Sequence, residues 1–437
     1  MRGLDAVLGR RLRTHITAPL AVAFSGGGDS LALLLATRAW ADANGRRLLA
    51  FTVDHGLNPD SEVWTRRCRE TAGRLGVAFQ ALRWEGAKPT TGLPAAARAA
   101  RHALLADAAR KAGARVILLG HTADDLIEAA AMRAEGSSVS DPAEWAPSPA
   151  WPQGRGVFLL RPMLSLRRAD IRDGLRVRGE PWIDDPANED QRFARARARK
   201  GQSSPERSEG EGDHAERSEG EGDHAEHGGG GASEPAGNGA FGGATSVAGA
   251  TPPPSSAWSP SPCGGGLSLA ITAPAAHLAA ACLCAGGTSR PPRGDRLQHL
   301  VARLRSGEAF TATLAGARIA SDGETAAFTR DPGRAGLPEL SLAPGEPTVW
   351  DGRFEIEATV PVTVRALGGL SRQLPRAQQA ALRALPAAIR PTLPVLLSRD
   401  GAVSCPILAD HPSVRATALV LPRFEAAIGL VDVEPAV

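Results

Sequence analysis

The stretch best suited to chemistry reads Ser25-Gly26-Gly27-Gly28-Asp29-Ser30. It lies between an apolar run at 21–24 and a leucine-rich run that begins at Leu31, so we expect a glycine turn between a buried strand and a helix. Glycine permits positive φ and a close backbone approach, while the free amides and the dipole of a helix N-terminus attract anions. The stretch is therefore predicted to bind phosphate.

Two familiar phosphate-binding motifs do not fit this stretch. A Walker-type loop ends in Gly-Lys-Ser or Gly-Lys-Thr, and no lysine is present here. A dinucleotide fingerprint requires a third glycine where Leu31 stands. The remaining alternative is a glycine turn that binds nothing, although Asp29 and the two serines also suit a phosphate site.

A second candidate is Asp54, which follows the apolar run at 48–53 in the segment Val53-Asp54-His55-Gly56-Leu57. A carboxylate at the end of a strand can reach the ribose or the adenine edge of a nucleotide, or a metal. The alternative is that Asp54 only forms an Asx turn before the next helix.

A third candidate segment follows the apolar run at 116–119 and contains His121, Asp125 and Glu128. Thr122 or Asp124 can cap a helix here, which places Asp125 and Glu128 three residues apart on one face. Two carboxylates so placed suit a cation, either Mg²⁺ or a substrate that bears an ammonium group. The alternative is acidic residues that only stabilise the helix dipole.

A fourth segment, at 182–200, begins with acidic residues and ends in a basic run that includes Arg195 and Arg199. Arginine donates two parallel hydrogen bonds to phosphate, so the run suits a nucleic-acid backbone. A solvated charged face is the alternative interpretation.

Strands and helices are expected to alternate over residues 1–200. Apolar runs at 21–24, 48–53, 78–82, 116–119 and 157–160 are separated by helical patterns at 31–43, 62–75, 93–112 and 124–133. Alternation of this kind predicts an α/β fold with a doubly wound parallel sheet and ligands at the carboxyl ends of its strands. The candidate segments described above all lie at such ends.

The rest of the chain divides into three parts by composition. Residues 201–262 contain the decapeptide ERSEGEGDHA twice, at 206–215 and 216–225, and then a Gly/Ala/Pro/Ser tract, so this part is expected to be a disordered insertion. Residues 263–307 show helical patterns at 275–284 and 295–304. Residues 308–437 show short β-like runs and one helix at 376–385, which predicts a small C-terminal domain.

Charge and cysteine content narrow the class of protein. Residues 1–200 carry 31 Lys and Arg against 22 Asp and Glu, which favours a polyanionic partner such as RNA. The chain has five scattered cysteines, which indicates neither a disulfide framework nor a zinc site and favours the cytoplasm. Apolar runs long enough to span a membrane, or to serve as a secretory signal, are not found in the sequence.

The four motifs, in this order, resemble those of the bacterial tRNA(Ile)-lysidine synthetase family of the ATP-pyrophosphatase (PP-loop) superfamily. That family typically shows SGGxDS, VDHGLRxxS, GHTADDQxET and DPxNxDxxFxRxxxR. This chain reads SGGGDS at 25–30, VDHGLNPDS at 53–61, GHTADDLIEA at 120–129 and DPANEDQRFARARAR at 185–199. The likeness covers about residues 15–200.

The resemblance implies a two-step reaction. ATP adenylates the C2 oxygen of the wobble cytidine in tRNA(Ile) with anticodon CAU, and free L-lysine then displaces AMP to give lysidine. Residues 25–30 would bind ATP, with Asp29 a candidate Mg²⁺ ligand, and His121, Asp125 and Glu128 would hold lysine or metal. Arg98 and Arg101 match an arginine-rich helix that contacts phosphate or the cytidine, and Arg195 and Arg199 would bind the tRNA.

Several positions depart from the family pattern. Leu126 stands where the family usually has Gln, Ala129 where it has Thr, and His102 where Tyr is common, and the loop after Arg133 also differs. These changes concern how the cytidine is positioned. Two other interpretations remain: a PP-loop enzyme that adenylates a small molecule, and an inactive RNA-binding homologue. The oligomeric state stays open, with a homodimer among the possibilities.

Overall fold

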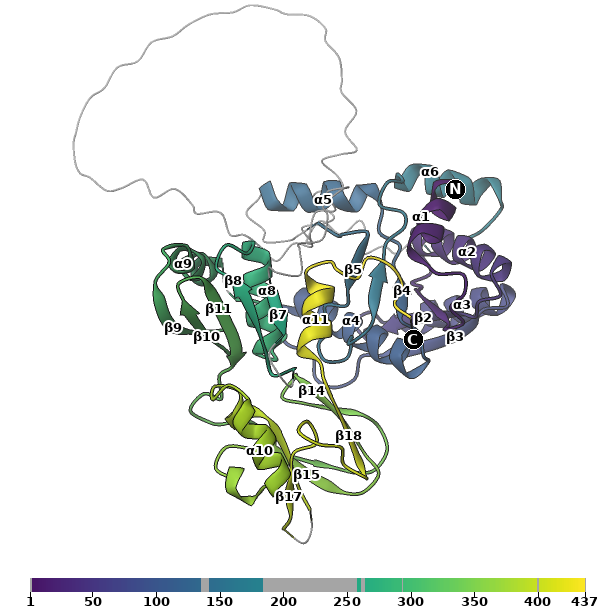
Figure 1. Cartoon of the computed structure of the whole chain (residues 1–437). Coiled ribbons are helices and arrows are strands. Elements are labelled where there is room, and N and C mark those ends of the chain that lie inside the picture. Colours follow the sequence, from purple (N-terminus) through teal and green to yellow (C-terminus); the bar gives the residue numbers. More distant parts are fainter. Residues whose placement is uncertain are drawn as a thin grey trace, which may run out of the picture.

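The computed structural model describes residues 2–134, 141–183, 258–260, 264–292, 294–398 and 401–436. These residues form three packed units, visible in Figure 1 as a purple-blue N-terminal unit, a teal-green middle unit and a light green unit. Four β-sheets are present in the described part of the chain, of which the largest has six strands.

The N-terminal unit contains the predicted parallel sheet. Its strands are β1 (Leu20–Ala23), β2 (Leu48–Asp54), β3 (Ala78–Arg83), β4 (Val116–Leu118), β5 (Trp145–Pro147) and β6 (Phe158–Leu160). Their order across the sheet is β3-β2-β1-β4-β6-β5, and all pairs are parallel except β5 with β6. The α/β fold class is confirmed, with an antiparallel strand at one edge.

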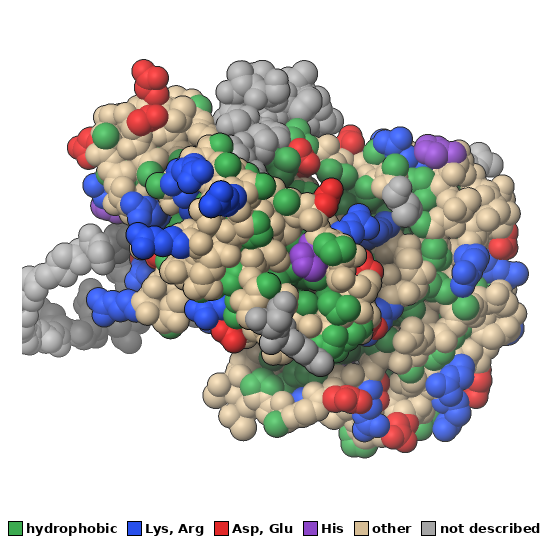
Figure 2. Space-filling model, turned by 60° about the horizontal axis from the view of Figure 1, so that its bottom comes forward, with side chains coloured by type: hydrophobic (Ala, Val, Ile, Leu, Met, Phe, Trp, Pro, Cys, Tyr) green, Lys and Arg blue, Asp and Glu red, His purple; other side chains and the backbone are tan. Residues whose placement is uncertain are grey.

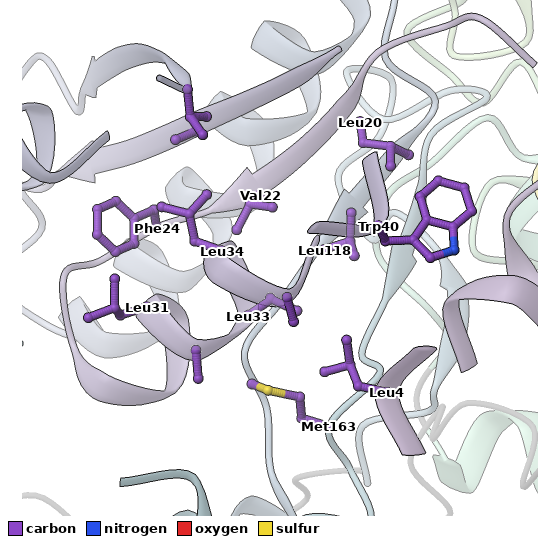
Figure 3. Packing of buried hydrophobic residues seen from close by; sticks show 14 of the residues in the cluster. Leu4, Leu20, Val22, Phe24, Leu31, Leu33, Leu34, Trp40, Leu118 and Met163 are labelled. Carbon is purple, nitrogen blue, oxygen red and sulfur yellow. The ribbon is translucent and has the colours of Figure 1, made fainter. Parts of the chain in front are cut away.

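Helices cover both faces of this sheet, because successive strand residues face opposite sides. On one face, Leu20, Val22 and Phe24 pack with helices α1 (Arg2–Arg11), α2 (Gly28–Ala43), α3 (Ser61–Arg74) and α6 (Arg168–Val177). In Figure 3, Leu31 and Leu34 of α2 lie beside Phe24 and Val22. On the other face, Ala21 and Ala23 pack with α4 (Leu93–Lys111).

The strand order reverses direction between β1 and β4, and this reversal places the site. In doubly wound sheets, ligands bind in the crevice outside the carboxyl ends of the strands at such a switch point. Residues 25–30 follow β1, and the segment that leads into α5 (Ala123–Ala134) follows β4. The two segments touch, since a Cβ on Gly120 would lie 3.3 Å from the carbonyl carbon and oxygen of Asp29.

The middle unit is an antiparallel sheet packed against three helices. The sheet order is β7-β8-β11-β10-β9, with β7 (Trp258–Pro260), β8 (Gly266–Ala270), β9 (Ala309–Leu314), β10 (Ala317–Asp322) and β11 (Thr325–Arg330). Helices α8 (Ala275–Ala285), α9 (Gly294–Arg305) and α11 (Val420–Ala427) share its core. The domain boundary expected at residue 307 therefore falls inside one unit. Strand β7 lies within residues 201–262, which were expected to be a disordered insertion.

The third unit holds two small antiparallel sheets around a common core. One contains β12 (Leu340–Leu342), β15 (Val362–Ala366), β16 (Pro394–Leu397) and β17 (Val403–Ser404), and the other β13 (Thr348–Trp350), β14 (Phe354–Ala358) and β18 (Val414–Ala418). Helix α10 (Arg376–Ala384) and two 3-10 turns, at Ser371–Gln373 and Arg390–Thr392, complete it. The helix predicted at 376–385 is found here as α10, together with short strands, whereas β9, β10 and β11 of the same predicted domain belong to the middle unit.

The chain then returns to the N-terminal unit, as the yellow segment after α11 shows in Figure 1. Trp145 Nε1 donates to the carbonyl of Val431 at 2.8 Å. The carboxylate of Glu434 accepts two hydrogen bonds from the Arg46 guanidinium, at 2.8 and 3.0 Å, and one from the backbone amide of Arg13 at 3.1 Å. The Arg46 and Glu434 side chains are 1% and 0% exposed. This buried ion pair attaches residues 430–434 to the N-terminal unit.

Removing one partner of this pair should destabilise the N-terminal unit, because it leaves an uncompensated buried charge. We expect Glu434→Ala to lower the free energy of unfolding by about 3 kcal/mol, measured by urea denaturation. The exposed neighbour Asp432 supplies the control, and Asp432→Ala should change it by less than about 0.5 kcal/mol. Equal effects of the two variants would contradict a structural role for the pair.

Candidate active site

The glycine loop, residues 25–30, is closed by its own side chains. Helix α2 begins at Gly28, and the first backbone bond of the helix runs from the amide of Leu31 to the carbonyl of Gly27 at 2.9 Å. The Ser30 hydroxyl donates to Gly27 O at 2.9 Å and accepts from the Ser25 amide at 3.2 Å. The first amides of α2 precede this bond and have no acceptor within the helix, which is the arrangement that favours an anion.

Gly26 is the position of the loop where a side chain is least tolerated. Its φ is +84°, in the left-handed region, and a Cβ there would lie 2.5 Å from Ile183 Cδ1 and 3.0 Å from Cys68 Sγ. The amide of Ile183 also donates to Gly26 O at 2.9 Å. The loop is therefore held between α3 and the segment that follows α6.

Three carboxylates meet around one guanidinium beside the loop. Arg168, at the start of α6, donates from Nε to Asp29 Oδ2 and from Nη1 to Glu128 Oε1, both at 3.0 Å. Its Nη2 lies 3.6 Å from Asp125 Oδ2. Asp29 belongs to the glycine loop, whereas Asp125 and Glu128 belong to α5. The structure thus brings together three of the predicted site residues through a residue that was not predicted.

The start of α5 fixes where these carboxylates point. Asp125 Oδ2 accepts hydrogen bonds from the amide and the hydroxyl of Thr122, at 2.8 and 3.0 Å, which is the reciprocal bond of a capping box. Asp124 faces α6 instead and accepts from the Arg168 amide at 2.7 Å and from Arg167 Nη2 at 3.0 Å. Asp125 thus serves the helix cap and the carboxylate cluster together.

Burial and charge act in opposite directions on this cluster. Burial raises the pKa of Asp29 above its ordinary value, and the Arg168 charge opposes that rise. Burial alone would lower the pKa of Arg168, but the charges of Asp29 and Asp125 and the hydrogen bonds outweigh it, so this pKa is raised. Arg168 therefore stays protonated, and with each of the three carboxylates counted as −1 the four side chains carry a formal charge of −2.

A basic group lies beside His121. Arg161, directly after β6, is 6% exposed, and burial together with the charges of Arg98 and Arg101 lowers its pKa to about 10. Burial and the same two arginines lower the pKa of His102 to about 3. Arg161 Nε donates to His121 Nδ1 at 3.1 Å. The two predicted arginines of α4 are therefore near the segment that contains His121.

Asp54 forms an Asx turn, which was the alternative to a role in binding a nucleotide or a metal. Its Oδ1 accepts a hydrogen bond from the Gly56 amide at 2.8 Å, at the end of β2 and next to β1. This Asx turn does not decide whether Asp54 also reaches a nucleotide, which stays a prediction. Arg195 and Arg199 lie outside the described residues, as does most of the fourth motif.

Comparison with known proteins agrees with this geometry. A family model for the PP-loop domain matches residues 7–202. The tRNA(Ile)-lysidine synthase of Caulobacter vibrioides is 49% identical over 439 residues, which cover 98% of each chain. The chain belongs to the tRNA(Ile)-lysidine synthase family. Members from Rhizobium meliloti and Brucella anthropi are 34% and 36% identical and cover 81% and 76% of this chain, and 77% and 72% of their own lengths.

Membership of the lysidine synthase family confirms the family resemblance and the PP-loop fold, but assigns no role to single residues. The sequence predicted no role for Arg168 or Arg161, although both donate hydrogen bonds to predicted site residues. The position of Arg161 could have indicated a role, because it directly follows the predicted strand at 157–160. For Arg168, the spacing of Ile171 and Leu175 suits one face of a helix that begins nearby.

The glycine loop yields a test by matched substitutions. Gly26→Ala adds a Cβ at positive φ and within 2.5 Å of Ile183 Cδ1, so we expect ATP affinity to fall at least about tenfold, measured by calorimetry. Gly45 also has a positive φ, +62°, but a Cβ there meets no atom within 4 Å. Gly45→Ala should therefore retain the affinity, and a similar loss in both variants would contradict a role of the loop in binding ATP.

Arg168 yields a second test, because its removal leaves three carboxylates without their shared cation. We expect Arg168→Met to reduce kcat/KM of the lysidine synthase reaction about 100-fold or more. The matched control is Arg178→Met, at the exposed C-terminal end of the same helix, which should stay within about twofold of the unsubstituted protein. Unchanged kinetics in Arg168→Met would show that the cluster does not organise the site.

Proposed function

We propose that this chain ligates free L-lysine to C2 of the wobble cytidine in tRNA(Ile) with anticodon CAU. In the first half-reaction the C2 oxygen attacks the α phosphorus of ATP and pyrophosphate leaves. In the second, the ε-ammonium of lysine gives up a proton and the resulting amine attacks C2. The C2–oxygen bond breaks, AMP leaves with its electron pair, and the new nitrogen loses a further proton to give lysidine. The observation that carries the proposal is the Arg168 cluster, which joins the glycine loop to the α5 carboxylates at the sheet's switch point.

The glycine loop and α2 would bind the phosphates of ATP. The loop amides and the N-terminal end of the α2 dipole attract negative charge, and Ser30 holds them in place through Gly27 and Ser25. Asp54, at the end of the adjacent strand, is proposed to face the nucleoside. Because the loop is shaped by its own hydrogen bonds, little reorganisation accompanies phosphate binding.

Mg²⁺ is a cofactor that the chemistry of the site fits. Asp29 Oδ1 is buried and accepts no hydrogen bond from the residues that the structure describes, whereas Oδ2 is bonded to Arg168. A buried carboxylate oxygen without a donor suits a hard cation. When bound, Mg²⁺ would neutralise charge on the phosphates. The role of Asp29 would be to hold the ion next to the loop.

Asp125 and Glu128 are proposed to bind the ammonium groups of lysine. The cluster keeps a formal charge of −2 after Arg168 is counted, so it attracts a cationic substrate. Glu128 is 2% exposed, which shields its carboxylate from water and strengthens its attraction to an ammonium. The cluster lies at the edge where the glycine loop ends, so both substrates would meet there.

Two basic surfaces support tRNA as the partner. One is the N-terminal unit, in which Arg98 and Arg101 lie beside the site and Arg195 and Arg199 are predicted contacts. The other lies on the third unit, where residues 358–398 contain five arginines and no acidic residue. Figure 2 brings the lower face of the molecule forward and shows Lys and Arg side chains gathered on the left part of that face. Within residues 358–398, Arg372, Arg376 and Arg383 are exposed, at and just before α10.

The reaction is placed in the cytoplasm, where tRNA, lysine and ATP are available together. Cysteine usage supports this: the four cysteines of the described residues are buried, and Cys68, Cys282 and Cys284 are free thiols. In the same part of the chain, the helices are too short or too polar to cross a membrane.

The decisive experiment is ATP-dependent incorporation of labelled lysine into a CAU-anticodon tRNA transcript. We expect incorporation by the unsubstituted protein and a loss of about 100-fold or more in Asp29→Ala, because the phosphate site loses its carboxylate. Asp42→Ala is the matched control on the same helix, since the Asp42 side chain is 67% exposed, and it should retain activity. Pyrophosphate release driven by a small metabolite, without incorporation into tRNA, would contradict the proposal.

A further inference from the structure

Arg161 is a buried cation that links the segment before β5 to His121. Its Nη1 donates to the carbonyl of Ala143 at 2.7 Å, and its backbone amide donates to the carbonyl of Glu144 at 2.8 Å. These two bonds fix the residue against the segment that leads into β5. Its Nε is then directed at His121 Nδ1, 3.1 Å away. The side chain is thus held at both ends, and its orientation toward His121 is set by the fold.

This hydrogen bond determines which ring nitrogen of His121 carries the hydrogen. A guanidinium has only donors, so Nδ1 has to offer its lone pair. In neutral imidazole the other nitrogen is then the donor, and Nε2 carries the hydrogen. A ring in this tautomer offers no lone pair at Nε2, so it suits neither a metal ion nor an ammonium group. It suits an oxygen that carries negative charge.

Among the described residues, positive charge and a helix N-terminus lie near His121. Besides the Arg161 charge, Arg98 and Arg101 contribute positive potential, since their charges act on Arg161. His121 also precedes α5 by two residues, and the N-terminal end of a helix dipole opposes a cation there. The carboxylates near this end of α5 are already engaged, Asp124 by Arg167 and the Arg168 amide, and Asp125 by the Thr122 cap.

His121 lies next to the glycine loop. The preceding residue, Gly120, comes so close to the loop that a Cβ would lie 3.3 Å from the carbonyl oxygen of Asp29. The loop is where phosphate is expected, so a phosphoryl oxygen bound there would share the crevice at the carboxyl ends of β1 and β4 with the segment that contains His121. A neutral N–H donor stabilises such an oxygen as charge develops on it, and gains strength where water is excluded.

We propose that Arg161 is a positioning residue that keeps His121 in its neutral Nε2–H form, so that His121 donates a hydrogen bond to a phosphoryl oxygen of ATP or of the adenylated cytidine. The inference rests on the proposed function and deepens it. It assigns different roles within the third motif: His121 donates to the phosphate, whereas Asp125 and Glu128 bind the ammonium groups of lysine. No proton is transferred by His121 in either half-reaction.

The tautomer can be measured without any enzymatic activity. In full-length protein labelled with ¹⁵N-histidine, two-bond ¹H–¹⁵N correlations distinguish protonated from unprotonated ring nitrogens. We expect His121, assigned by loss of its signals in His121→Gln, to show a protonated Nε2 and an unprotonated Nδ1 at neutral pH. Arg161→Met should produce a mixture of tautomers or a charged ring, whereas Arg161→Lys should keep much of the original form. A protonated Nδ1 in the unsubstituted protein would overturn the proposal.

Lysine incorporation into the tRNA transcript tests the catalytic consequence. The amide nitrogen of Gln can replace Nε2–H, whereas that of Asn lies nearer the position of Nδ1. His121→Gln should therefore retain activity within about tenfold, and His121→Asn should lose about 100-fold. Arg161→Met should cost about tenfold alone but cause no further loss in the His121→Gln background. Additive losses in the double variant would show that Arg161 acts elsewhere.

The two kinds of measurement separate the inference from the proposed function. If the unsubstituted protein incorporates no lysine, the proposed function fails, while the NMR spectra still decide the tautomer. If incorporation occurs and Asn replaces His121 as well as Gln does, the proposed function stands and the donor role is wrong. Thermal melting of each variant identifies losses that come from unfolding alone.

Discussion

The contacts of Arg168 with Asp29, Asp125 and Glu128 are the constraint on which the site depends. Three carboxylates from two segments repel one another in a partly buried space, and a planar guanidinium can contact all three because its donors point in different directions. Lysine in its place would be a point charge on a flexible stem. The glycine loop after β1 and the helix after β4 are thereby held in register, although these segments are nearly one hundred residues apart.

The glycine loop and α5 were predictable because local chemistry determines them. Gly26 has a positive φ, apolar runs precede both segments, and Thr122, one of the two expected cap residues, lies at the start of the helix, where its amide bonds to Asp125. What joins them was not predictable. Arg168 is one of many arginines in a chain with three lysines, and its helix is rich in charge, with Ile171 and Leu175 its buried apolar residues. Only the packing of α6 against α2 reveals its role.

The outer parts of the fold show the same limit of sequence patterns. Strand β5 has three residues, one of them proline, and pairs with a single neighbour, so neither length nor alternation marks it. Helix α11 follows the third unit in sequence but packs in the core of the middle unit with α8. Composition alone suggests a domain boundary at residue 307. In the structure, the boundaries between units are set by which apolar faces pack against one another, and α8, α9, α11 and the sheet of β7 to β11 share one core.

The buried pair of Arg46 and Glu434 has a consequence for the length of the chain between them. The two residues are 388 positions apart, and the intervening sequence includes the repeated decapeptide at 206–225. The entropy of closing so long a loop depends on the logarithm of its length, so one more copy of the ten residues would cost only about 0.02 kcal/mol. Expansion or contraction of the repeat during evolution therefore leaves the closure of the catalytic unit almost unaffected.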